Sequence, residues 1–250
     1  YWTLPLNPVQ EERLRDPRPS AKTLEKAKEL RAKLRHSMDG VISTSMRDKG
    51  LDYGINFGLT MEFIVRLAKE LGEDGLLASY LLSRDVRELQ LIGQQIYPAS
   101  CLNFSIATAL AERSMPNPEL RDCLCKNLFD RNTMLPQYAL AWLMQARYED
   151  LSTIAYTTLA RHFTFGYKFA HKSWEQCLLR CAFKTLDEDA PYMTSEQRAA
   201  LLMLKRWGRS DKDIQAQILQ APEFVRWETS GSCLFGEYVD DIKFEFSYEG

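Results

Sequence analysis

A long succession of amphipathic helical patterns is the feature that most constrains how this chain of 250 residues can fold. From Ser20 onward, apolar residues recur every three or four positions, beginning with Leu24, Ala27, Leu30 and Leu34. That spacing places them on one face of a helix. Similar patterns continue to about residue 220, in units of roughly 35 to 45 residues that each contain an antiparallel helix pair. They predict an all-α fold, an α–α superhelix (solenoid) of stacked helix pairs, with a compact helical bundle as the alternative.

Helix start signals support this pattern at several points. Ser20 and Thr60 each precede an apolar-periodic run that they can cap. Asn117 is followed by a proline and an acidic residue, which favour the first turn of a helix. Two pairs have the three-residue spacing of a capping box, Asp85 with Glu88 and Thr194 with Gln197. We therefore expect helices to begin at each of these positions.

The two ends of the chain depart from the helical pattern. Residues 1–19 hold four prolines and mixed charges, which predicts an extended N-terminal arm before a repeat domain over 20–220. In the extension 221–250, Ile242, Phe244, Phe246 and Tyr248 alternate with polar residues. This alternation predicts a short β-hairpin-like tail that covers the last repeat, and its free edge could add a strand to a partner protein.

Composition excludes several classes of protein. The net charge is −2 and the sequence pI is about 6.0, so no global positive field attracts nucleic acid, and a DNA site would have to be a local basic patch. No apolar run is long enough to span a membrane, and we expect a cytoplasmic protein that does not bind membranes. The six cysteines lack the paired spacing of a zinc site, which predicts free, mostly buried thiols and no metal or other cofactor.

One glycine-rich stretch interrupts the helices. It reads SMRDKGLDYGINFGLTMEFIVRLAKEL over residues 45–71, and its glycines Gly50, Gly54 and Gly58 permit tight reversals of the chain. We expect Tyr53 and Phe57 to anchor this loop against the first helices. Farther on, Arg87 and Glu88 are neighbours in a helix and are expected to face apart, with Arg87 in an ion pair between repeats.

Residues 38–97 resemble the N-terminal part of the DNA alkylation repair enzyme family, the AlkD-like glycosylases, and in particular a branch typical of Bacteroidetes. The shared features are the helix that ends in Met46-Arg47, the glycine loop with an aromatic residue, Leu59-Thr60 at the next helix, and Arg87-Glu88 at the third. The resemblance is fainter to about residue 220. It implies HEAT-like helical repeats with a positive concave face that cradles duplex DNA, and excision of alkylated purines by active members.

The family's catalytic pattern is not retained. Its W-D-x-V-D stretch aligns with Arg121-Asp122-Cys123-Leu124-Cys125, which places Cys125 where the catalytic aspartate stands and Arg121 where the tryptophan stands. An arginine of the family falls near Thr153, and a tyrosine falls near Ser45. Glycosidic cleavage builds positive charge on the sugar that a carboxylate stabilises, and a thiol does not supply one. The fallback acid is Asp122, one turn away, which is otherwise a helix-surface residue able to pair with Lys126.

These observations leave three functions open. The first is a DNA-binding repeat protein with weak or no glycosylase activity, the second an active alkylpurine glycosylase that uses Asp122, and the third a scaffold that binds a protein through its repeat face or its C-terminal tail. Whether the chain is an enzyme is therefore open. A phosphate-binding stripe is expected to use seven basic residues, which otherwise are ordinary surface charges: Arg121, Lys126, Arg131, Arg161, Lys205, Arg206 and Arg209. Four tryptophans are expected in the packed core and less often as platforms for bases: Trp142, Trp174, Trp207 and Trp227.

Overall fold

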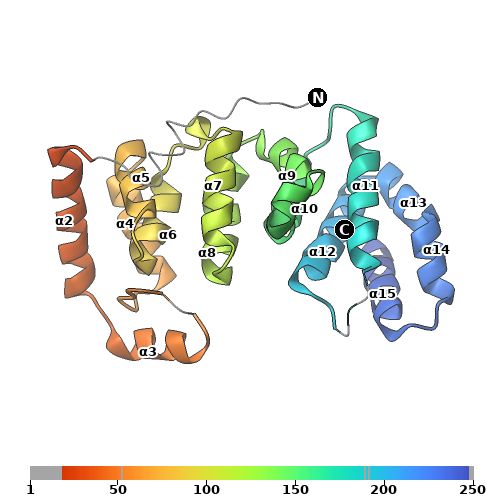
Figure 1. Cartoon of the computed structure of the whole chain (residues 1–250), viewed down its shortest axis with the longest axis horizontal. Coiled ribbons are helices and arrows are strands. Elements are labelled where there is room, and N and C mark those ends of the chain that lie inside the picture. Colours follow the sequence, from red (N-terminus) through yellow and green to blue (C-terminus); the bar gives the residue numbers. More distant parts are fainter. Residues whose placement is uncertain (1–18, 52, 189, 191, 248–250) are drawn as a thin grey trace. The chain divides into compact units, whose positions relative to one another are not determined.

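The computed structural model describes residues 19–51, 53–188, 190 and 192–247, and over these residues the fold is all-α (Figure 1). The described residues form fourteen α-helices and three short 3-10 helices, and they contain one isolated parallel bridge, between Ile55 and Val86, in place of a sheet. The chain divides into two compact units, unit 1 up to Asn132 and unit 2 from Thr133. The all-α prediction is confirmed.

Unit 1 contains these elements: α2 (Ala21–His36), α3 (Gly40–Asp48), α4 (Met61–Leu71), α5 (Gly75–Leu82), α6 (Arg87–Ile96), η1 (Ala99–Cys101), α7 (Phe104–Ser114), α8 (Pro118–Asn127) and η2 (Phe129–Arg131). Unit 2 contains these elements: α9 (Leu135–Leu143), η3 (Ala146–Leu151), α10 (Ser152–Thr164), α11 (Lys172–Leu186), α12 (Ser195–Ser210), α13 (Lys212–Gln220), α14 (Pro222–Thr229) and α15 (Cys233–Ser247). The sequence patterns did not single out α7 or α14.

Most of the expected helix starts are present. The side chains of Ser20, Thr60 and Asn117 each accept a hydrogen bond from a backbone N–H in the first turn of the helix that follows, and Thr194 with Gln197 forms a complete capping box. The capping box expected from Asp85 and Glu88 is wrong. Helix α6 begins after Val86 without a side-chain cap, because the carboxylate of Glu88 binds a different segment of the chain.

Each main packing contact in unit 1 joins helices that lie one to three elements apart in the chain. Helix α2 contacts α5, α4 and α5 contact α6, and α8 contacts both α6 and α7. In Figure 1 these helices follow one another in chain order, with α3 lying across one end of the group. Helix α6 is central, and nine of its ten residues are buried. This serial packing is what stacked helix pairs require.

Unit 2 is organised around one helix. Helix α12 packs against α10, α11, α13 and α15, and its buried Trp207 stacks on Phe163 of α10 with ring centroids 4.7 Å apart. Trp142 and Trp227 are also buried, whereas Trp174 is half-buried. Three of the four tryptophans therefore belong to the core, where their large apolar surfaces stabilise packing.

The predicted β-hairpin-like tail is wrong. Residues 233–247 form helix α15, whose buried residues Tyr238, Val239, Ile242 and Phe246 follow the helical spacing, while Phe244 is 65% exposed. The alternation that suggested a strand was coincidental, because packing on α12 and α14 decides the conformation. The described tail therefore offers no strand edge to a partner. Tyr248 lies outside the described residues, as does almost all of the expected arm over 1–19.

Helix α15 is fixed to α12 by two ion pairs. Lys205 contacts Asp241 at 3.0 Å, and Arg209 contacts Glu245 at 3.1 Å. Since both residue numbers rise by four, the two helices run in the same direction. Phe246 lies against Gly208, where a Cβ atom would come within 2.2 Å of the phenyl ring. None of the helices in the described part of the chain has the length and apolar character that a membrane span requires.

Candidate functional site

The glycine-rich loop is fastened to α3 at one close contact. Gly58 has a φ of +72°, and a Cβ atom there would lie 2.1 Å from the carbonyl oxygen of Asp39. The backbone N–H of Asp39 donates to the carbonyl oxygen of Phe57 at 2.8 Å. The hydroxyl of Ser43 donates to the carbonyl oxygen of Asn56 at 3.0 Å. Only glycine combines this backbone conformation with this approach. The loop therefore returns to the point where α3 begins.

Glu88 holds the next part of the loop. Its carboxylate is fully buried and accepts hydrogen bonds from the backbone N–H groups of Phe57 at 3.1 Å and Leu59 at 3.2 Å. The guanidinium of Arg87 donates to the carbonyl oxygen of Leu59 at 2.8 Å and to Glu88 at 3.1 Å. The expectation that Arg87 and Glu88 face apart is wrong, because both side chains turn toward the same loop.

Arg87 also connects α6 to α8. Its Nε and Nη2 atoms donate to the two carboxylate oxygens of Glu119 at 2.8 and 2.6 Å, a bidentate pair. The hydroxyl of Tyr53 donates to the same carboxylate and, at 3.2 Å, to the side-chain oxygen of Asn117. The expected ion pair of Arg87 is thus present between two helix pairs. We call Tyr53, Arg87, Glu88 and Glu119 the Arg87 cluster.

The charges of the Arg87 cluster support one another. Burial would raise the pKa of Glu119, but hydrogen bonds from Arg87 and Tyr53 outweigh it and lower that pKa below the usual carboxyl value. Burial would likewise lower the pKa of Arg87, and its carboxylate partners raise it instead. Burial and the hydrogen bond to Glu119 raise the pKa of Tyr53. These shifts keep Tyr53, Arg87 and Glu119 in their ordinary protonation states at neutral pH. All four members are hydrogen-bonded, so the cluster anchors the loop and supplies no free acid or base.

Helix α8 carries the positions that align with the family's catalytic stretch. Cys125 is fully buried, whereas the side chain of Asp122 is 67% exposed and lies 3.5 Å from Arg121. Cys123 is half-buried, and burial together with the nearby carboxylates of Glu119 and Asp122 raises the pKa of its thiol to about 11. Neither thiol supplies the negative charge that a cationic sugar requires, and Asp122 points to solvent.

The other two aligned positions belong to other helices. Ser45 is an exposed residue of α3 in unit 1, and Thr153 is a half-buried residue of α10 in unit 2. Neither has a side chain equivalent to the family's tyrosine or arginine. Within unit 1, the structure therefore brings Arg121, Asp122 and Cys125 together on one helix and leaves Ser45 apart.

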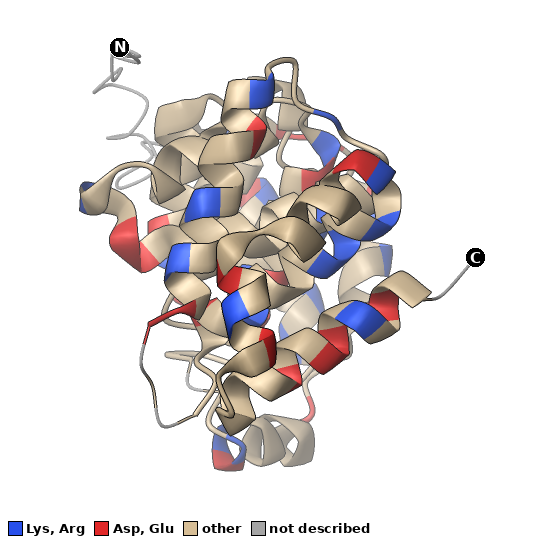
Figure 2. Ribbon diagram, turned by 90° about the vertical axis from the view of Figure 1, so that its right-hand side faces the viewer, with Lys and Arg blue, Asp and Glu red and all other residues tan. Residues whose placement is uncertain are grey.

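Three of the seven basic residues expected to bind phosphate form ion pairs with carboxylates of the protein. Arg131 pairs with Glu73 at 3.1 Å and donates to the carbonyl oxygens of Gln95 and Tyr97 at the end of α6. Lys205 and Arg209 form the ion pairs with α15 described above. Figure 2 shows basic and acidic residues mixed over this face of unit 2, with mainly acidic residues on the helix that leads to the C-terminus.

The remaining basic residues are divided between the units. Arg121 lies beside Asp122, and Lys126 is exposed on the same helix with no ion pair to a described carboxylate. Arg161 on α10 and Arg206 on α12 are half-buried. The seven residues thus do not form one continuous set on a single helix.

Two features were missed by the sequence interpretation. The partner of Arg87 is Glu119, which was noted only as an acid in the first turn of a helix and lies 32 residues away. The most basic of the described helices is α2, with six Lys or Arg and two Glu residues, and its Lys and Arg face was not considered as a binding surface. The first has no local signal, whereas the second could have been found by summing charge over each predicted helix.

No further chemical centre is found among the described residues. They contain no group of three or more His, Cys, Asp or Glu side chains placed to hold a metal ion. All six cysteines are free thiols, but of these only Cys125 is buried, so the expectation of mostly buried thiols is wrong. Comparison of the chain with family models, with curated proteins and with solved structures gives no match.

Proposed function

We propose that this chain is a HEAT-like helical-repeat protein of the alkylation-repair type that binds duplex DNA and does not cleave N-glycosidic bonds. The resemblance of residues 38–97 to that family supports the lineage. The serial packing of the helices in unit 1 supports the repeat architecture. DNA is the partner that the resemblance implies, and a net charge of −2 requires it to be bound at a local basic patch.

The proposal that the chain does not cleave glycosidic bonds rests on the surroundings of the aligned residues on α8. The position that aligns with the catalytic aspartate is a fully buried thiol, and the nearest acid on the same helix, Asp122, is exposed beside Arg121. An enzyme that cleaves a glycosidic bond needs a carboxylate directed at the sugar. On α8 only Glu119 is a shielded acid, and it is fully engaged by Arg87 and Tyr53.

A titration with duplex DNA and a base-release assay test the two parts of this proposal. We expect a fluorescence anisotropy titration to give a dissociation constant of about 1–100 μM near physiological salt, tightening steeply as salt is lowered. We expect no release of methylated purines from alkylated DNA above background. Binding that does not respond to salt would contradict the first part. Release that is abolished in Asp122→Asn would contradict the second.

A protein partner is the second candidate, and one observation favours it. Helix α3 has no buried residue, and Val41 at its start is 81% exposed, close in sequence to Met38 at 62%. Exposed apolar side chains on neighbouring positions are typical of binding surfaces. Absence of DNA binding in the titration, at every salt concentration used, would favour this candidate.

A further inference from the structure

Helix α2 carries its positive charge on two flanks that differ in their partners. On one flank, Lys26 contacts Asp74 at 2.6 Å and Lys33 lies 3.8 Å from Glu70. On the other, Lys28, Arg31 and Arg35 form no ion pair with any described carboxylate. The helix therefore presents one neutralised flank and one open positive flank, which we call the α2 stripe (Lys28, Arg31, Arg35).

The spacing within the α2 stripe follows the helix period. Its three residues lie three and four positions apart, which places their side chains on one side of the helix, and Leu24, 42% exposed, continues the same row. The buried residues Thr23, Ala27, Leu30 and Leu34 occupy a different side. Because the core-facing residues are fixed by packing, the stripe is held at the surface of unit 1.

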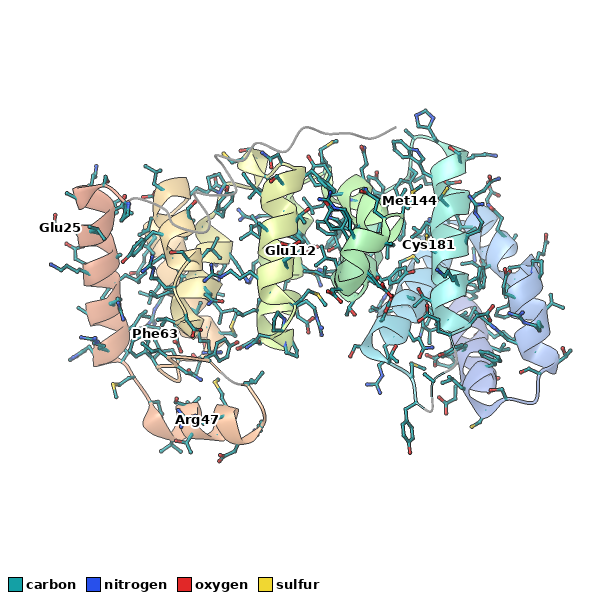
Figure 3. The ribbon with its side chains drawn as sticks, in the orientation of Figure 1. Glu25, Arg47, Phe63, Glu112, Met144 and Cys181 are labelled. Atoms are coloured by element: carbon teal, nitrogen blue, oxygen red, sulfur yellow. The ribbon has the colours of Figure 1, made fainter. Side chains whose placement is uncertain are left out.

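The position of α2 leaves this surface accessible to a large ligand. Among the helices of unit 1, α2 packs on α5 and lies at one end of the group in Figure 1. Figure 3 shows Glu25 projecting from α2 away from the other helices of the unit. Lys28 and Arg35 are exposed. Arg31 is half-buried, and its Nε atom is shielded and has no hydrogen-bond partner among the described residues. Part of the Arg31 side chain therefore lies against the protein.

The dimensions of the α2 stripe match a phosphate backbone. With a rise of about 1.5 Å per residue, Lys28 to Arg35 covers about 10 Å. A strand of duplex DNA carries one charge per roughly 3.4 Å of axis, so this length spans about three phosphates for three cations. Arginine suits this role because its planar guanidinium binds phosphate oxygens in pairs. Acidic residues of α2, Glu25 and Glu29, lie between the two flanks, and the helix keeps a net charge of +4.

We propose that the α2 stripe binds the phosphate backbone of duplex DNA, an inference that rests on the DNA-binding function proposed above. It names a surface that differs from the basic residues of α8, α10 and α12. The contacts are to phosphates alone, so the binding does not depend on base sequence.

The test compares two triple variants of the full chain with the wild type. K28Q/R31Q/R35Q neutralises the α2 stripe, and K172Q/R180Q/K184Q removes the same charge from exposed positions on α11. Glutamine has a helix propensity similar to lysine and arginine, and circular dichroism checks that both variants fold. We expect the α2 variant to bind duplex DNA at least about tenfold more weakly. The slope of the logarithm of its binding constant against the logarithm of salt concentration should fall in magnitude by roughly 2 to 3. The α11 variant should stay within about twofold of the wild type.

Each outcome distinguishes the inference from the function on which it rests. Wild-type binding that the α2 variant retains in full would overturn the α2 stripe and leave the proposed function standing. Absence of wild-type binding would overturn both. A parallel titration uses vesicles of phosphatidylserine and phosphatidylcholine. If the α2 variant loses vesicle binding but not DNA binding, the stripe serves an anionic lipid surface, and the assignment to DNA is wrong.

Discussion

At Gly58, a methyl group would meet the carbonyl oxygen of Asp39 at 2.1 Å and the backbone nitrogen of Ser43 at 2.8 Å. Gly58→Ala therefore has to move α3 as well as accept a left-handed conformation, and we expect it to lower the free energy of unfolding by about 3 kcal/mol. Gly50→Ala is the matched control, because Gly50 also has a positive φ but no described atom within 4 Å of a Cβ atom there. Its cost should be about 1 kcal/mol. Equal losses for both variants in urea unfolding would contradict the close contact.

Glu119 gives the Arg87 cluster a dependence on pH. Because its pKa is lower in the folded chain than the ordinary carboxyl value of 4.5, its contribution is complete above that value and is lost as the pH falls below it. We expect Glu119→Gln to lower the free energy of unfolding at pH 7 by about 2–4 kcal/mol, and this deficit to shrink at pH 3. Urea unfolding at the two pH values measures the difference.

The control for Glu119 lies on the same helix. Asp122→Asn removes an exposed carboxylate, whose pairing with Arg121 should contribute less than about 1 kcal/mol at either pH. If Glu119→Gln behaved like Asp122→Asn at pH 7, the Arg87 cluster would not be the anchor of the loop. A deficit of the same size at pH 7 and pH 3 would show that the loss of a hydrogen-bond acceptor matters, and that the charge of the side chain does not.

At the scale of elements, the contact between α12 and α15 depends on Gly208, whose lack of a side chain leaves room for the ring of Phe246. Gly208→Ala would place a Cβ atom 2.2 Å from the ring of Phe246, and we expect a loss of about 1–3 kcal/mol because the ring and the end of α15 must shift. Gly236 lies inside α15, and a Cβ atom there would have no described atom within 4 Å, so Gly236→Ala should stabilise the fold by about 0.5–1 kcal/mol. Thermal unfolding of both variants shows whether each substitution lowers or raises the stability of the fold. A neutral Gly208→Ala would mean that α15 does not pack here.

Sequence patterns were reliable for features determined within a few residues. The caps at Ser20, Thr60 and Asn117 were predicted because a cap binds the turn beside it. Glu88 was misread as a cap, since its true partners, Phe57 and Leu59, are about thirty residues away. The tail was misread because residues 238–246 are compatible with either period until α12 and α14 are present to bury one face.

For the candidate site, the sequence located residues but not their environments. An ion pair at Arg87 was expected, but Glu119 could not be chosen among the acids of the chain without knowing that α6 packs on α8. The exposure of Asp122 and the burial of Cys125 follow from the same packing. Likewise, the occupied state of Lys205 and Arg209 depends on α15 being a helix.

At the scale of the whole molecule, charge is unevenly distributed. The chain carries −2 and α2 carries +4, so all the remaining residues together carry −6. A chain of net negative charge repels polyanions overall, and attraction is expected where positive charge is left unpaired, as on α2. Association with DNA would then be oriented from the first encounter, and strongly weakened by salt.

Helix α3 and the glycine loop leave the body of unit 1 and return to it at nearly the same point, where Asp39 meets Phe57 and Gly58. The excursion between them buries no residue of α3. Tyr53 and Ile55 fix the later part of this segment to Glu119 and Val86, so a change of length is tolerated only before Tyr53. There it costs mainly the entropy of loop closure, about 0.6 kcal/mol for each doubling. The end of α3 is therefore a natural place to graft a foreign peptide, because an insertion there leaves the anchors at Tyr53 and Gly58 in place.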